Sequence, residues 1–61
     1  MKSSELIDLI TSDGWKLDRI KGSHHIFIHQ SKSGIVVIPH PKKEVPKGTA
    51  NNILKQAGLR H

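Results

Sequence analysis

The chain has 61 residues, which suffices for one small domain but not for a large active-site cleft or a dinucleotide-binding fold. It contains no cysteine, which excludes a disulfide framework and a thiolate metal site. Ten Lys and Arg against five Asp and Glu give a net charge of +5. We therefore predict a single basic domain over residues 1–61, with a small core that would gain stability from a partner.

The charge is unevenly distributed. Residues 1–14 carry Lys2 against three carboxylates, a net charge of −2, whereas residues 15–61 carry nine basic side chains against two carboxylates, a net charge of +7. A basic surface of this density attracts polyanions, most often nucleic acid. No stretch approaches the roughly 18 apolar residues of a membrane span, and the first ten residues lack the apolar block of a signal peptide. The sequence predicts a soluble, cytoplasmic protein without membrane association.

The first predicted element is a helix over residues 4–13. Leu6, Ile7 and Ile10 follow helical spacing and form one apolar stripe. The hydroxyl of Ser3 or Ser4 can cap the free amides of its first turn. A glycine at position 14 can take a positive φ and end the helix there.

Three short strands are predicted next, over residues 15–20, 24–29 and 35–38. A turn at residues 21–23 separates the first two, and a polar loop at residues 31–34 separates the second from the third. Side chains alternate across a strand, so the even-numbered residues of 24–29 share one face and the odd-numbered residues the other. The pattern leaves open which face is buried. Pro39 and Pro41 end the last strand, because proline cannot donate to the ladder.

The last predicted element is a helix that follows a basic loop at residues 42–47. Its apolar stripe is spaced as in the first helix, Thr49 can cap it or Pro46 can occupy its first turn, and Gly58 can end it. The predicted class is α+β: an α-β-β-β-α order with a three-stranded antiparallel sheet, two helices on one face and the opposite face open to solvent. Double-stranded-RNA-binding domains have the same order, although a fold alone does not give a function.

Histidine is unusually frequent for so short a chain. The five are His24, His25, His29, His40 and His61, and His61 is assigned no role. Because the chain has neither Cys nor Tyr, histidine is the only side chain that can move protons near neutral pH.

A metal site is not predicted from these histidines. His25 and His29 would lie about 13 Å apart along a strand, and a pair made by His29 and His40 lacks carboxylate partners. We interpret His25 and His29 as partly buried structural residues that flank Phe27, with hydrogen-bonded ring nitrogens.

His24 has a different setting, because it directly follows the turn Lys21-Gly22-Ser23. Glycine permits close approach of a bulky ligand, and exposed amides with the Ser23 hydroxyl can bind a phosphate oxygen. With a lysine and an imidazole beside them, these residues form a candidate site for cleavage of a phosphodiester.

The order of four segments resembles the HicA (YcfA-like) family of toxins. Residues 21–27 resemble its Gly-Ser-His signature, and residues 37–41, Val-Ile-Pro-His-Pro, resemble its VPHP element. Residues 46–49, Pro-Lys-Gly-Thr, and residues 53–59, Ile-Leu-Lys-Gln-Ala-Gly-Leu, resemble its closing pattern. Each segment is unspecific alone, but their order and spacing within 61 residues make the resemblance specific.

This resemblance implies the toxin of a type II toxin–antitoxin system with the double-stranded-RNA-binding-like fold. Such toxins cleave mRNA without the ribosome, and a HicB-type antitoxin binds them and covers the active face. The essential histidine of the family corresponds to His24. His25 follows it directly, and a shift of one residue in the alignment would exchange their roles.

The implied reaction needs neither metal nor cofactor. A neutral imidazole, with an ordinary pKa of about 6.5, can take the proton of the ribose 2′-hydroxyl as general base. Attack on the adjacent phosphate leaves a 2′,3′-cyclic phosphate and a 5′-hydroxyl. The sequence does not identify the general acid, for which His40 and water are candidates. The predicted RNA-binding residues are Lys21, Gly22, Ser23, His40, Lys42, Lys43 and Lys47, the last three if their loop folds back toward His24.

Two other functions fit the same pattern. One is a non-catalytic RNA-binding module, although its usual lysine cluster at the start of the last helix is here placed before that helix. The other is a protein-interaction domain whose basic face meets an acidic partner. RNA binding without cleavage would favour the first, and absence of any RNA binding at low salt would favour the second.

Overall fold

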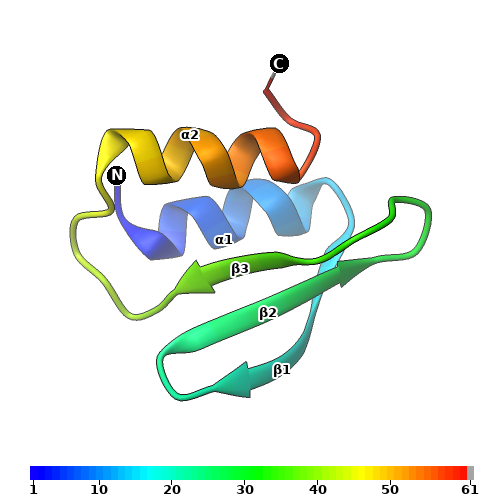
Figure 1. Cartoon of the computed structure of the whole chain (residues 1–61), viewed down its shortest axis with the longest axis horizontal. Helices are drawn as coiled ribbons and strands as arrows, with labels where there is room; N and C mark the ends of the chain where they lie inside the picture. The colour runs from blue at the N-terminus through cyan, green and yellow to red at the C-terminus, as the bar shows by residue number, and fades with distance from the viewer. Residues whose placement is uncertain (61) are drawn as a thin grey trace.

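The computed structural model describes residues 1–60 and has the predicted α-β-β-β-α order (Figure 1). The helices are α1 (Ser3–Ser12) and α2 (Lys47–Gln56), and the strands are β1 (Trp15–Lys21), β2 (His24–His29) and β3 (Val36–Pro39). The sheet is antiparallel with the strand order β1-β2-β3. No helix in the described part of the chain is long and apolar enough to cross a membrane. His61 lies outside the described residues.

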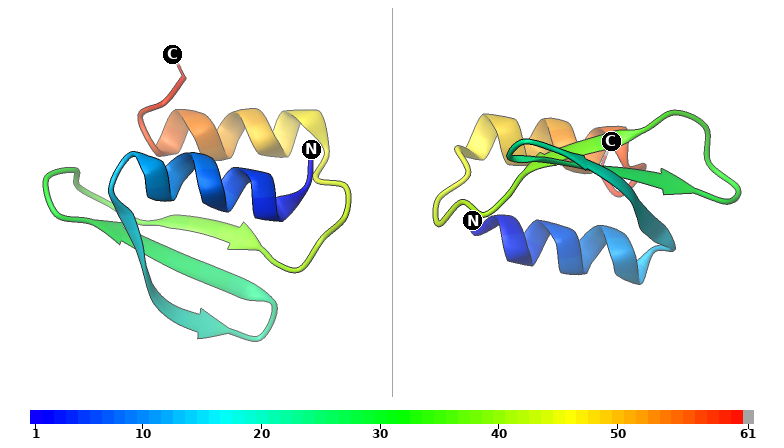
Figure 2. Two further views of the ribbon diagram at one scale, coloured as in Figure 1. Left: turned by 180° about the vertical axis from the view of Figure 1, so that it is seen from behind. Right: turned by 90° about the horizontal axis from the view of Figure 1, so that it is seen from below.

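Both helices pack with one face of the sheet, which confirms the predicted α+β architecture. Phe27 is buried on this face, so the odd-numbered residues of β2 point toward the helices. Helix α1 contacts β1 and β3, and α2 contacts β3 and α1 (Figure 2). We call this side of the sheet the helix face and the other side, which carries the even-numbered residues of β2, the open face.

The start of α1 differs from the prediction that Ser3 or Ser4 caps it. Lys2 is the N-cap residue and Ser3 already lies in the helix. The carboxylate of Glu5 instead accepts the backbone N–H of Lys2 at 2.8 Å. The Ser3 hydroxyl is thereby free for contacts with the loop that follows β3, so the cap prediction was wrong because a tertiary contact uses this side chain.

A β-bulge interrupts β1 at Asp18. Leu17 pairs with Phe27, but Arg19 pairs with Ile26, so one extra residue of β1 stands between them. A bulge exchanges the faces of all residues beyond it. Arg19 and Lys21 consequently share the open face with Ile26 and His24, whereas an unbroken strand would have placed Asp18 there.

The β2–β3 loop is held against the ends of both helices. Lys32 Nζ lies 2.5 Å from the Asp13 carboxylate, just after α1, and donates to the carbonyl of Ala57, at the end of α2, at 3.0 Å. Gly58 leaves room for this lysine, because a Cβ there would lie 2.9 Å from Nζ, and its φ of 78° disfavours a side chain in any case. The β2–β3 loop thus connects the sheet to the C-terminal ends of both helices.

The Asp13–Lys32 contact makes the stability of the fold depend on pH. The hydrogen bond from Lys32, together with the charge of Lys32, holds the pKa of Asp13 below its ordinary value of 3.8. Because the pKa of Asp13 is lower in the folded than in the unfolded state, the ionised carboxylate stabilises the fold above the unfolded-state pKa. This contribution is lost as the pH falls from there through the folded-state pKa. We expect the melting temperature to decrease from about pH 6 to pH 3 less steeply in Asp13→Asn than in the wild type.

The matched control for this experiment is Asp8→Asn. Asp8 is an exposed carboxylate on α1 that lies outside the Asp13–Lys32 cluster. Melting curves of the three proteins across this pH range provide the measurement. An Asp13→Asn protein with the full wild-type dependence on pH would contradict the assigned role of this carboxylate.

Candidate functional site

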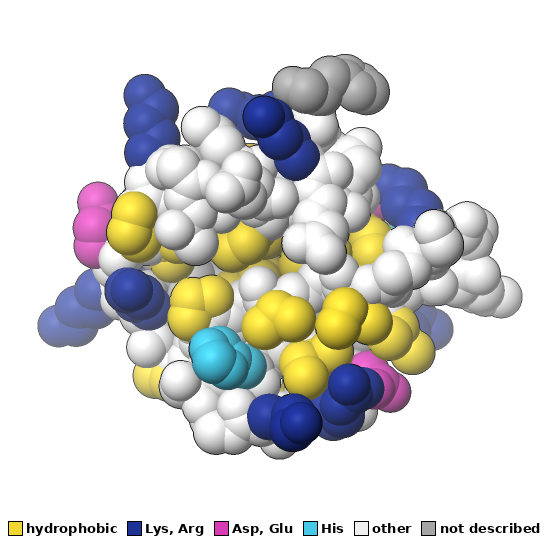
Figure 3. All heavy atoms as spheres, viewed as in Figure 1, with side chains coloured by type: hydrophobic (Ala, Val, Ile, Leu, Met, Phe, Trp, Pro, Cys, Tyr) yellow, Lys and Arg dark blue, Asp and Glu magenta, His cyan; other side chains and the backbone are white. Residues whose placement is uncertain are grey.

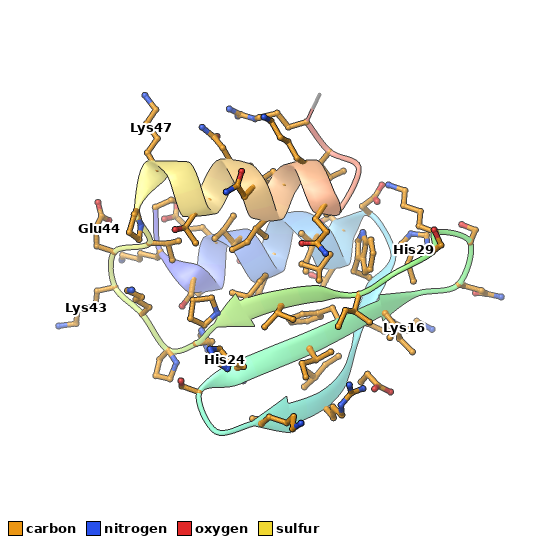
Figure 4. The ribbon with its side chains drawn as sticks, in the orientation of Figure 1. Lys16, His24, His29, Lys43, Glu44 and Lys47 are labelled. Carbon is orange, nitrogen blue, oxygen red and sulfur yellow. The ribbon has the colours of Figure 1, made fainter. Side chains whose placement is uncertain are left out.

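His24 is the first residue of β2 and its side chain is exposed on the open face (Figure 4). It pairs with Lys21 of β1 on one side and with Pro39 of β3 on the other. In the space-filling view a histidine side chain lies on this face among hydrophobic side chains, with basic side chains along the lower edge (Figure 3). The ring is therefore not covered by the helices and can be reached by a polymer.

The turn before His24 is open to a ligand. Gly22 has a φ of 59°, and a Cβ added to it would meet nothing within 4 Å. Ser23 is exposed, and its carbonyl accepts the backbone N–H of His40 at 2.8 Å. This hydrogen bond joins the turn to the end of β3, so the predicted Lys21–His24 segment is anchored next to the segment that contains His40.

Cations from β1 lie on the same face of the sheet as His24. Lys16 pairs with Ile28, Arg19 with Ile26 and Lys21 with His24, which places the three basic side chains on the open face. Sequence reasoning had singled out only Lys21. Arg19 reaches this face through the bulge, which cannot be deduced from strand alternation. Asp18 lies beside them and forms an ion pair with Arg19 at 2.6 Å, so part of the positive charge is neutralised locally.

His40 and His25 form a pair on the other side of the sheet. Their ring centroids are 4.9 Å apart in an edge-to-face arrangement. Nδ1 of His40 lies 2.7 Å from the hydroxyl of Ser3, and Nδ1 of His25 is buried with no hydrogen-bond partner among the described residues. The prediction that His25 has hydrogen-bonded ring nitrogens is thus wrong for Nδ1, because the ring packs against His40 instead of a polar group.

His29 has the structural role that the sequence predicts. Its Nδ1 accepts the backbone N–H groups of Ser31 and Lys32 at 3.0 and 3.2 Å, so Nε2 carries the proton and donates to the carbonyl of Asp13 at 2.7 Å. The residue after Asp13 must be glycine, because a Cβ on Gly14 would lie 2.9 Å from His29 Nε2. His29 is therefore fixed at the far end of β2 from His24 (Figure 4).

The basic loop after β3 lies along the start of α1 and does not cover the open face. Backbone hydrogen bonds join Ser3 N–H to the carbonyl of Lys42 at 3.0 Å and Val45 N–H to the carbonyl of Met1 at 2.7 Å. Lys43 extends outward from this loop, and Lys47, the first residue of α2, points away from the sheet (Figure 4). The three predicted loop lysines are thus not gathered around the His24 ring.

The described residues contain no cluster of three or more possible metal ligands. His29 and His40, which the sequence leaves as a conceivable pair, belong to opposite ends of the sheet and contact Asp13 and Ser3, respectively. The arrangement around His24 is one exposed imidazole beside cations and a turn that a ligand can approach closely, which suits acid–base chemistry on an anionic polymer.

Comparison with known proteins agrees with this architecture. The family model for the HicA toxin of bacterial toxin-antitoxin systems matches residues 3–59. A solved structure of a toxin–antitoxin complex from Streptococcus pneumoniae contains a similar chain, with 37% identity and a TM-score of 0.80 over 97% of this chain and 98% of that one. No curated protein matched.

Proposed function

Because this chain belongs to the HicA toxin family of bacterial toxin–antitoxin systems, we propose that it acts in the cytoplasm as an endoribonuclease that cleaves mRNA without the ribosome. The observation that carries the proposal is the position of His24. Its imidazole is exposed on the open face, next to an unobstructed glycine turn and beside Lys21. These are the groups that a metal-independent cleavage of RNA requires.

In the proposed reaction His24 acts as general base. Its neutral ring takes the proton of the 2′-hydroxyl, and the resulting oxygen attacks the adjacent phosphorus. The bond to the 5′-oxygen of the next nucleotide breaks, which leaves a 2′,3′-cyclic phosphate on one fragment. The leaving 5′-oxygen takes a proton from water, because His24 is open to solvent whereas the His40 ring packs on His25 on the other side of the sheet.

The residues around His24 would bind and polarise the scissile phosphate. Lys21, directly across the strand pair, can stabilise the extra negative charge that develops on the phosphate oxygens. The exposed Ser23 hydroxyl and the amides of the Gly22 turn can donate hydrogen bonds to the same group. His40, Lys42, Lys43 and Lys47 would contact phosphates further along the RNA.

The open face also supports binding of an antitoxin of the HicB type. Ile28 is 43% exposed on this face, and Val37, which pairs with Ile26, lies between it and the His24 end of the sheet. RNA backbone binding does not need an apolar strip of this kind, whereas a protein interface does. A protein that covers this strip would exclude RNA from His24, and the similar Streptococcus pneumoniae chain comes from a toxin–antitoxin complex.

The test of this function is incubation of the purified protein with a defined RNA, followed by analysis of the fragment ends. We expect 2′,3′-cyclic phosphate and 5′-hydroxyl ends, undiminished cleavage in EDTA, and no cleavage of an RNA with a 2′-O-methyl group at the cut site. Cleavage of the methylated RNA would exclude the mechanism. RNA binding without any cleavage would favour the non-catalytic RNA-binding module.

A further inference from the structure

A cleft of about 580 Å³ lies between the start of α1 and the loop that follows β3. Its lining includes His40, Ser4 and three lysines, Lys2, Lys42 and Lys43. Within the described chain no carboxylate lines it, and the nearby Glu5 accepts the backbone N–H of Lys2. The charged residues around the cleft are thus all basic, although the cleft belongs to the helix side of the fold and not to the open face.

The cleft has a fixed internal framework. Ser3 is the only buried polar side chain among residues 1–60, with 1% of its surface exposed. Its hydroxyl donates to the carbonyl of Lys42 at 3.1 Å, accepts the backbone N–H of Lys42 at 2.9 Å and lies 2.7 Å from Nδ1 of His40. Because Ser3 occupies Nδ1, the His40 nitrogen that remains for a ligand is Nε2. These hydrogen bonds make the burial of the hydroxyl tolerable in a small core, and they fix the positions of one imidazole and one loop.

The cleft adjoins the His24 end of the sheet. His24 pairs with Pro39, and the next residue, His40, donates its backbone N–H to the carbonyl of Ser23. A single strand of RNA that presents one phosphate to His24 and continues past Pro39 therefore reaches the cleft after a short length of the RNA backbone. Lysines and a histidine around a cavity are suited to the phosphate groups of such a strand.

We propose that this cleft is a second phosphate subsite, which binds the backbone of single-stranded RNA next to the nucleotide that His24 cleaves. Lys2 and Lys43 supply charge, the imidazolium form of His40 donates from Nε2, and Ser3 is a positioning residue that holds His40 and Lys42. This subsite rests on the proposed ribonuclease function for the identity of its ligand. It extends the RNA-binding surface from the open face around the end of β3 and adds Lys2 and Ser4 to it.

Binding of a non-cleavable RNA tests the subsite separately from catalysis. The probe is a short single-stranded RNA with 2′-O-methyl groups throughout, titrated at several salt concentrations. We expect the double variant Lys2→Gln/Lys43→Gln to bind it at least about fivefold more weakly than the wild type. The slope of log affinity against log salt should also become shallower by about 0.7 for each phosphate that the variant no longer neutralises. Lys55→Gln, an exposed charge on α2 outside the cleft, is the matched control and should bind as the wild type does.

Nuclear magnetic resonance locates the contact. Titration with the same RNA should shift the amide signals of Ser4 and Lys42 and the Nε2 signal of His40. An affinity and a salt slope in the double variant equal to those of the wild type would overturn the subsite. Signals that shift with inorganic pyrophosphate but not with the RNA would also overturn it. Failure of the wild type to cleave unmodified RNA would contradict the ribonuclease function itself, which is a separate measurement.

Discussion

Replacement of His24 by alanine is expected to reduce RNA cleavage by at least about 100-fold, because a general base contributes about 10² to 10⁴ to the rate of proton transfer. Within the described residues no second imidazole lies on the open face: His25 and Phe27 point to the helix face, His29 is bound to Asp13, and His40 packs on His25. No neighbour can therefore take over the proton. Because His24 is exposed and outside the core, the variant should fold as the wild type does.

His25→Gln is the matched control, since the two histidines are adjacent and on opposite faces. It should retain most of the cleavage activity, because its ring does not reach the open face. Rates are measured with one defined RNA, and circular dichroism confirms the fold of both variants. Loss of activity in His25→Gln with retention in His24→Ala would show that the two roles are exchanged and would refute the assignment.

Replacement of Phe27 by alanine should have the largest effect on stability. Phe27 is 2% exposed at the centre of the core, and removal of such a ring costs about 3 to 5 kcal/mol. The free energy of unfolding of a chain of this length is about 3 to 9 kcal/mol. We therefore expect the variant to be largely unfolded, or to melt far below the wild type.

The chain carries its own reporter for this measurement. Trp15 is the only tryptophan, is 1% exposed and donates from its ring to the carbonyl of Ala57, so its fluorescence changes when the two layers separate. Leu17→Ala is the control, because Leu17 pairs with Phe27 across the strands but is 49% exposed. It should cost less than about 1 kcal/mol. Equal loss of stability in both variants would contradict the position of the core.

The order of elements could be predicted from the sequence because apolar spacing and glycine positions are local signals. The stripe in α1, the β-branched run in β3 and the glycine after each helix all depend on neighbours within a few residues. Which face of β2 is buried could not be predicted, because both faces carry apolar and histidine side chains. Phe27 and Ile26 are both buried, but only Phe27 belongs to the core beneath the helices, which places His24 with Ile26 on the open face.

The surroundings of the site depended on long-range contacts that no local pattern contains. Pairing between β1 and β2 creates the bulge at Asp18, and only this bulge brings Arg19 to the open face. The use of Ser3 to hold His40 joins residues 37 positions apart. A serine before a helix favours a cap in any sequence, so the contact that replaces the cap could be found only in the folded chain.

The bulge in β1 also bears on how the free protein behaves at high concentration. β1 is an edge strand whose outer backbone groups have no partner within the sheet, and Leu17 and Ile20 beside them are about half exposed. A straight edge of this kind is a template for pairing with a second copy and for aggregation. The extra residue at Asp18 breaks the regular spacing of those groups and inserts charge between the two apolar side chains, which disfavours pairing of β1 with a second copy of the chain.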